Sequence, residues 1–189
     1  MALRRQSGSP ERELASFHWG LIPSWAKDPA IGNRMINARS ETIAEKPSFR
    51  EAFKSRRCLV LTDGYYEWQK RGSRKQPYFF HRHDNQPFVF AGLWERWLDP
   101  QSGSSKETAT ILTTAANEQI EPFHHRMPVI LEPENYDRWL DPELSDRSLL
   151  APLLASQPPA NLVIDPVSTL VNSPRNDDPR CLEPPRELF

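Results

Sequence analysis

The residues of this chain that are best suited to chemistry are two histidines and an arginine that come directly before an apolar strand. They are His124, His125 and Arg126, and an apolar run follows at 129–131. Imidazole titrates near neutrality, so either histidine can act as a general acid or base, and the arginine adds a fixed cation. The pattern does not choose between the two histidines. The alternative is that both are ordinary surface or structural residues.

A carboxylate within an aromatic segment is the second candidate. Glu67 follows Tyr65 and Tyr66 and precedes Trp68. Aromatic neighbours exclude water, which raises the pKa of a carboxyl group toward the value that a general base needs. We therefore predict that Glu67 is a general base at the end of a strand, with a surface glutamate in a hairpin as the alternative.

An asparagine and an arginine two residues apart form the third cluster. In an extended segment Asn37 and Arg39 project to one face, where the amide can orient a substrate and the guanidinium can hold a phosphate. The alternative is a turn with a solvated arginine. Nearby, Trp19 and Trp25 flank a proline turn, which is consistent with core packing or with a platform for an unstacked base.

Metal and disulfide chemistry are not expected. His81 and His83 share a strand face, but no third ligand lies near them in the sequence. Cys58 and Cys181 are far apart, so they build neither a disulfide framework nor a CxxC metal site, and we interpret both as structural. The sequence predicts no metal and no cofactor.

Length and composition are those of an ordinary globular protein. The chain has 189 residues, and we expect one domain over residues 1–189 with a tail at 182–189. Its apolar runs are far shorter than the roughly 20 residues that cross a bilayer, and its first residues lack the apolar core of a secretory signal. We therefore expect no membrane segment and a cytoplasmic location. The proline-rich piece at 158–159 is predicted to be a loop.

The formal net charge is only −1, but the charges are unevenly distributed. Residues 34–57 contain seven Lys or Arg and three acids, a local +4, whereas residues 132–189 contain five Arg and eleven acids, a local −6. A net charge near zero argues against a protein that coats polyanions by bulk charge. The basic segment could hold a nucleic acid on one face, and the alternative is a solvated helix face.

The elements that must position these residues are short strands and a few helices. A capping-box pattern begins at Ser48, and Phe49, Ala52 and Phe53 share a helical face, so a helix is expected to run to about Arg56. The other expected elements are strands at 58–62, 78–83, 88–94 and 108–113, a hairpin turn at 84–87, a hairpin tip in 1–14 leading into a strand at 14–19, and helices at 133–140 and 146–154. This order predicts an α+β domain with a largely antiparallel sheet.

Seven ordered motifs together resemble the SRAP family, the SOS response-associated peptidases, which are also described as abasic-site processing proteins. The motifs are Trp19–Trp25, Asn37–Thr42, Gly64–Trp68, Ala91–Glu95, Leu112–Asn117, His124–Leu131 and Val171–Asp177. The resemblance runs from Trp19 to about Cys181. It implies a curved, barrel-like antiparallel sheet with peripheral helices. It also implies a role in the DNA damage response, with single-stranded DNA that contains abasic sites as the partner.

The resemblance also assigns roles to individual residues. Asn37, Glu67 and His124 match the family's catalytic asparagine, glutamate and histidine, which selects His124 over His125. In the family, the amine of an N-terminal cysteine attacks the aldehyde of the abasic sugar, and the thiol closes a thiazolidine crosslink. The resemblance further implies that Arg39, Arg126 and Trp19 contact the DNA strand.

This chain departs from the family pattern at its first residues, which are Met1 and Ala2. A thiazolidine needs an amine and a thiol on one residue, so neither Cys58 nor Cys181 can replace an N-terminal cysteine. We expect the chain as written to form no stable crosslink and to be truncated at its N-terminus, with upstream codons for Met-Cys-Gly-Arg. A degenerate gene copy is the alternative.

Three functions follow from these residues. The first is an abasic-site crosslinking enzyme with the lyase and peptidase activities that the family name implies. The second is a binding module for damaged single-stranded DNA without chemistry. The third and weakest is a hydrolase that uses Glu67 and His124 on another substrate, since no oxyanion-hole motif is evident. We expect a monomer in a bacterial-type cytoplasm, associated with the nucleoid when bound to DNA.

Overall fold

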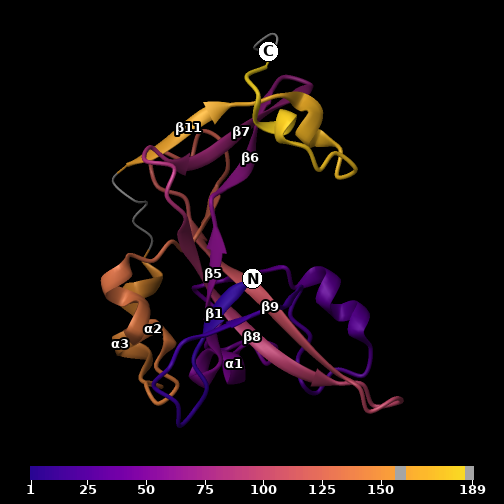
Figure 1. Cartoon of the computed structure of the whole chain (residues 1–189), viewed down its shortest axis with the longest axis vertical. Helices are drawn as coiled ribbons and strands as arrows, with labels where there is room; N and C mark the ends of the chain where they lie inside the picture. Colours follow the sequence, from indigo (N-terminus) through magenta and orange to yellow (C-terminus); the bar gives the residue numbers. More distant parts are fainter. Residues whose placement is uncertain (156–160, 186–189) are drawn as a thin grey trace. The chain divides into compact units, whose positions relative to one another are not determined.

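A computed structural model describes residues 1–155 and 161–185 of the chain, as drawn in Figure 1. Its contacts divide the chain into two compact units. The first unit comprises residues 1–61, 89–114 and 128–157, and the second comprises residues 62–88, 115–127 and 158–189. The loop predicted at 158–159 and residues 186–189 of the predicted tail lie outside the described residues. The single domain that we expected stays a prediction.

The larger sheet has eight strands, and most of its residues lie in the first unit. In the order of the sheet, its main path is β10 (Arg126–Pro128), β9 (Ser105–Ala115), β8 (Phe88–Leu98), β5 (Arg57–Thr62), β1 (Ala2–Arg4) and β2 (Glu13–Ala15). Two short strands, β3 (His18–Trp19) and β4 (Asn37–Arg39), pair in parallel with β9. The sheet curls as a half-barrel, which confirms the predicted α+β class and its curved, largely antiparallel sheet.

The smaller sheet belongs to the second unit. It has three antiparallel strands in the order β11 (Leu162–Pro166), β7 (Arg74–Arg82) and β6 (Gly64–Arg71). The β6–β7 hairpin pairs Glu67 with Tyr78 and Tyr65 with Phe80. Because side chains alternate along a strand, these four side chains project from one face of the sheet.

Short helices connect the strands, and the three predicted helices are confirmed. The α-helices are α1 (Arg50–Ser55), α2 (Tyr136–Leu140) and α3 (Arg147–Leu154), and the 3-10 turns are η1 (Pro29–Arg34), η2 (Pro133–Asn135), η3 (Thr169–Asn172) and η4 (Pro179–Leu182). Asp146 caps α3 through a hydrogen bond from the Ser148 N–H, as predicted. The capping box at Ser48 is wrong, because Phe49 occupies the N-cap of α1 and makes no side-chain cap.

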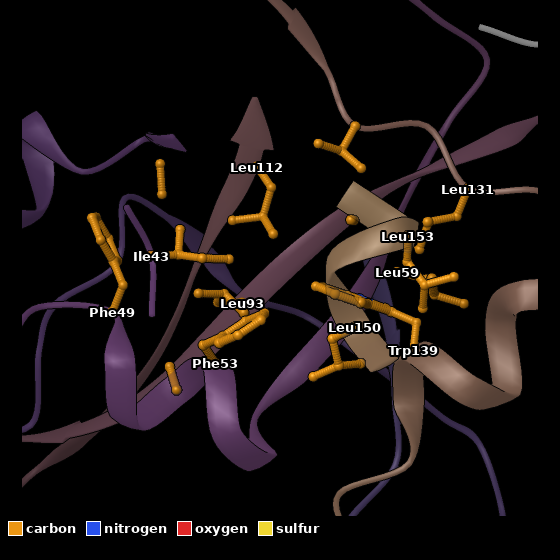
Figure 2. Packing of buried hydrophobic residues seen from close by; sticks show 14 of the residues in the cluster. Ile43, Phe49, Phe53, Leu59, Leu93, Leu112, Leu131, Trp139, Leu150 and Leu153 are labelled. Carbon is orange, nitrogen blue, oxygen red and sulfur yellow. The ribbon is translucent and has the colours of Figure 1, made fainter. Parts of the chain in front are cut away.

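The main core lies in the first unit and is built from buried side chains of both the helices and the sheet. Figure 2 shows Phe53 of α1 and Phe49, the N-cap residue of that helix, together with Leu93 and Leu112 of the sheet. From the other side, Trp139 at the end of α2 packs into the same cluster and contacts Phe53 at a ring-centroid distance of 6.3 Å. The helical face that we predicted for α1 is therefore the face that covers the sheet.

A buried arginine joins the helix ends of this unit. Arg57 is only 1% exposed, and its guanidinium donates to backbone carbonyls at the ends of α1 and α2 and in the turn after α2. The acceptors are the carbonyl oxygens of Phe53 (2.6 Å), Lys54 (2.7 Å), Trp139 (2.6 Å), Leu144 (2.9 Å) and Asp141. The carbonyls of Phe53, Lys54 and Trp139 lie in the last turns of their helices, where helical N–H donors run out, so one side chain satisfies several of them at once. Burial lowers the pKa of Arg57 to about 10, which leaves it charged at neutral pH.

The strand predictions are right in position and short in length. All four predicted strands are present as β5, β7, β8 and β9, and three of them extend several residues further. The hairpin predicted at 84–87 is wrong. A turn is present, with Asn85 at φ 54, but β7 pairs with β6 and β11, whereas β8 pairs with β5 and β9. The N-terminal hairpin is confirmed, since β1 and β2 pair antiparallel, but the single strand predicted at 14–19 is wrong, because β2 ends at Ala15 and β3 pairs with β9.

The two cysteines lie inside the protein. Cys58 and Cys181 are both free and buried, and burial raises the pKa of the Cys58 thiol to about 12. Within residues 1–155 and 161–185, no helix is long and apolar enough to cross a membrane.

Replacing Arg57 tests the guanidinium hub. Arg57→Met leaves several buried carbonyls without a donor, and we expect it to lower the free energy of unfolding by about 3 kcal/mol or more. Urea denaturation monitored by tryptophan fluorescence measures this loss. Arg50→Met on the exposed side of α1 is the matched control, expected to stay within about 0.5 kcal/mol of the parent. Equal losses in the two variants would contradict the role of Arg57.

Candidate functional site

The alternation of side chains along β6 determines the candidate site. Tyr65, Glu67 and Gln69 point to one face, and Tyr66 and Trp68 point to the other. Glu67 therefore lies in the middle of a strand, and our expectation that it ends one is wrong. Gly64 is the first residue of the strand, and a side chain there would clash, because a Cβ would lie 2.2 Å from the Phe79 ring.

His124 reaches this face from a loop of tight turns between β9 and β10. The Ile120 and Glu121 N–H groups donate to the Asn117 carbonyl, and the His124 N–H donates to the Ile120 carbonyl at 3.1 Å. Ile120 is fully buried, so its side chain fixes the turn to the core of the second unit. The Ala116 N–H closes the loop by donating to the His125 carbonyl. A short loop with this many internal hydrogen bonds holds the histidine in a defined position.

Glu67 and His124 meet in the second unit. The Glu67 Oε1 and His124 Nδ1 atoms are 3.7 Å apart, and the two side chains are 21% and 41% exposed. The pair is therefore accessible to a solute but partly shielded from water. At this separation each charge stabilises the opposite charge on its neighbour.

The Nδ1 atom of His124 has a backbone partner in both of its protonation states. The Arg126 N–H lies 3.2 Å away and donates when Nδ1 is unprotonated. The Arg126 carbonyl lies 2.9 Å away and accepts when Nδ1 carries a proton. The ring can thus exchange its Nδ1 proton without rotating, which is what a general acid and base needs.

The surroundings of Glu67 disfavour its charge. Burial raises the pKa of the Glu67 carboxyl, although the His124 ring and the Trp68 backbone N–H both favour the ionised form. Burial, and then the charge of Glu67, also raise the pKa of the neighbouring Tyr65 phenol, so Tyr65 stays neutral. A carboxyl with a raised pKa accepts a proton more readily than an ordinary glutamate, and here it lies beside an imidazole that can exchange protons with it.

The neighbours of His124 differ in environment. His125 is exposed, and its ring centroid lies 4.4 Å from that of His124. Arg126 begins β10 and is half-buried. Only His124 of the two histidines has an ion-pair contact with Glu67 in the described part of the chain. The catalytic role of His124 stays a prediction.

The other predicted residues, Trp19, Asn37 and Arg39, belong to the first unit. Asn37 and Arg39 are exposed and flank the buried Ala38, so they share a face of β4 as predicted. Parallel pairing with β9 places them opposite Ile111 and Thr113. This arrangement excludes the alternative in which the arginine lies in a turn.

The two tryptophans of the proline turn present their rings to solvent. Trp19 is 57% exposed and Trp25 is 58% exposed, while Leu21 and Ile22 between them are buried. The Trp19 indole N–H donates to the Ile36 carbonyl at 2.8 Å, which fixes the ring in place. Exposed aromatic rings held by a hydrogen bond suit base stacking better than core packing.

Two polar contacts to β6 were not found from the sequence. Gln69 Nε2 donates to the Pro122 carbonyl in the His124 loop, and the Trp68 indole N–H donates to Asn172 Oδ1 at 2.7 Å. The sequence contains one signal for Gln69. It lies two residues after Glu67, so in a strand the two side chains share a face. For Asn172, the motif at 171–177 was visible, but its contact was not.

No metal site is found among the described residues, in which no three His, Cys, Asp or Glu side chains gather as ligands. His81 instead pairs with Asp165, with 2.9 Å between its Nε2 and the carboxylate.

The α+β fold and the Glu67–His124 pair define a class that comparison with known proteins identifies. The family model for SOS response associated peptidase (SRAP) matches residues 1–174. The chain therefore belongs to the SRAP family.

Individual relatives agree with this assignment. The chain is 45% identical to the abasic site processing protein YoqW of Bacillus subtilis, over 93% of this chain and 78% of the relative. It is 38% identical to the abasic site processing protein HMCES of Gallus gallus, over 96% of this chain and 60% of that protein. The chain is also similar to a protein of solved structure from Bacteroides thetaiotaomicron, with a TM-score of 0.84 and 34% identity. The match covers 95% of this chain and 79% of that protein's chain.

The raised pKa of Glu67 predicts how stability depends on pH. As pH rises from the unfolded to the folded pKa of this carboxyl, the unfolded chain releases its proton first, so the folded state loses stability. Glu67→Gln removes this loss. We expect its melting temperature to exceed that of the parent by a few degrees at pH 8 and to equal it at pH 3, where both side chains are neutral.

Scanning calorimetry at the two pH values provides the measurement. Glu118→Gln, at an exposed position of the loop that carries His124, is the control and should show no difference that depends on pH. A Glu67→Gln variant that is less stable than the parent at pH 8 would show that the carboxylate is stabilised in place.

Proposed function

We propose that this protein binds single-stranded DNA at abasic sites and processes the exposed sugar, with Glu67 and His124 as its acid–base pair. The observation that carries the proposal is the 3.7 Å contact between a partly buried carboxyl and an imidazole that has a backbone partner in either protonation state. Relatives that are named abasic site processing proteins, at 38% and 45% identity, support the substrate class.

The proposed chemistry begins with the closed form of the abasic sugar. Opening it breaks the bond between C1′ and the ring oxygen, so a base removes the hydroxyl proton on C1′ while an acid protonates the ring oxygen. In this proposal His124 donates one proton and the ionised Glu67 accepts the other, which their 3.7 Å contact supports. The product is the open-chain aldehyde.

Crosslinking requires two further steps at C1′. An amine adds to the aldehyde, and the adduct loses water to give an iminium ion. A thiol on the same residue then adds to that carbon to close a thiazolidine. Glu67 relays the protons released by the amine and the thiol. Cys58 and Cys181 are buried and internal, so the crosslink is proposed for a form whose first residue is cysteine.

The DNA contacts are proposed separately for each unit. In the first unit, Arg39 and Asn37 contribute an exposed guanidinium and amide for the phosphate and sugar, and Trp19 offers a fixed ring for an unstacked base. In the second unit, Arg126 contributes a cation next to His124. A monomer suffices for these roles, and the protein acts where DNA is, at the nucleoid of a bacterial-type cytoplasm.

A binding module for damaged single strands, without covalent chemistry, is the second candidate. The observation in its favour is that the exposed features suited to DNA, Trp19 and Arg39, are independent of any thiol. Peptidase, hydrolase and lyase activities follow the family name and stand as proposals of lower rank than crosslinking.

Covalent capture on a denaturing gel tests the function. The chain, and a form extended upstream to a Met-Cys-Gly-Arg start, are incubated with single-stranded DNA that bears one abasic site. We expect a shifted band from the extended form, and we expect Glu67→Gln and His124→Ala in that form to slow its appearance by about 100-fold. Binding without a band in either form would leave the binding module as the function.

Binding as a function of salt tests the role of Arg39. An arginine that neutralises one phosphate of a single strand contributes about 0.7 to the slope of log affinity against log salt. Arg39→Gln should therefore lower that slope by about 0.7, measured by fluorescence anisotropy. Arg138→Gln, at an exposed position of α2, is the matched control and should leave the slope unchanged. Equal slopes in both variants would remove Arg39 from the interface.

A further inference from the structure

We propose that Gln69 is a positioning residue that holds the His124 loop against Glu67, so that the two side chains stay in contact. The inference rests on the proposed function, since it names a residue that sets the geometry of the acid–base pair. Gln69 lies two residues after Glu67 on the same face of β6. Its Nε2 donates to the Pro122 carbonyl at 3.2 Å, two residues before His124.

The orientation of the Gln69 amide is determined by two donors. The Arg71 Nε–H donates to Gln69 Oε1 at 2.9 Å, and the Tyr78 hydroxyl reaches the same oxygen at 3.3 Å. Both groups need an acceptor, so the amide oxygen must face them and the amide nitrogen must face Pro122. Arg71 Nη2 also donates to the Tyr78 hydroxyl at 3.2 Å, which leaves that hydroxyl's proton for Gln69.

The same small network also contacts the next residue of the loop. The Phe123 ring packs edge-on against Tyr78 at 4.7 Å and against Phe80 at 5.3 Å between centroids. The two residues before His124 are thus both held in place. Pro122 is held through its backbone carbonyl, and Phe123 is held through its ring. The half-buried His124 side chain itself contacts Glu67, the His125 ring and the backbone of Arg126.

The loop offers a matched control. Gln119 Nε2 donates to the Leu162 carbonyl at 3.3 Å, which is the same kind of bond from the same loop, directed at β11 and away from Glu67. Gln69→Met and Gln119→Met each remove an amide-to-carbonyl contact at nearly constant side-chain length, and Gln69→Met also removes the acceptor of Arg71 and Tyr78. If Gln69 merely stabilised the loop, the two variants would behave alike.

Proton NMR of the His124 ring measures the positioning directly. In the parent protein, the Cε1–H resonance should show two inflections with pH, one from its own protonation and a smaller one from Glu67. Glu67→Gln identifies the smaller inflection by abolishing it. We expect Gln69→Met to abolish it as well although Glu67 is present, and Gln119→Met to retain it. A second inflection of undiminished size in Gln69→Met would overturn the inference.

Crosslinking by the extended form separates this inference from the proposed function. We expect Gln69→Met to slow adduct formation about tenfold and Gln119→Met to leave it unchanged, because a displaced base loses rate steeply with distance. Adduct formation at the parental rate by Gln69→Met would overturn the positioning role alone. Loss of the second inflection in Gln69→Met, together with no adduct from the parent extended form, would overturn the proposed function and leave the contact between loop and strand established.

Discussion

The two-residue repeat of β6 is the constraint on which the candidate site depends. It places Tyr65, Glu67 and Gln69 on one face, and each side chain meets a different part of the second unit. Tyr65 stacks on Phe80 at 4.8 Å, Glu67 faces His124, and Gln69 holds the loop that carries His124. A shift of one residue in the register would turn all three side chains to the opposite face.

Arg57 and Glu67 are both removed from water, but their surroundings differ. Arg57 has a structural role, whereas Glu67 is suited to acid–base chemistry. Arg57 is surrounded by backbone carbonyls that compensate for its lost hydration, so it stays charged and joins the ends of α1 and α2. Glu67 has few compensating donors, and its pKa rises as a result. A group that gives up stability at neutral pH in this way is typical of a functional site.

The features that suit DNA follow another principle. Large aromatic rings such as Trp19 and Trp25 are usually buried, and here each is more than half exposed. Their indole N–H groups donate to backbone carbonyls of Ile36 and Pro47, so the rings are fixed before any ligand binds. A preorganised ring loses little conformational entropy when a base stacks on it.

Local patterns in the sequence determined the three α-helices, the positions of β5, β7, β8 and β9, the buried face of α1, the shared face of Asn37 and Arg39, and the identity of the candidate residues. These properties depend on neighbours in the chain, which a sequence displays. Only the tertiary structure decided which strands pair, so that the turn at Asn85 joins two sheets instead of closing a hairpin. It also decided that His124 faces Glu67 and that Gln69 supports their contact, because hydrogen bonds between distant segments leave no periodic trace in the sequence.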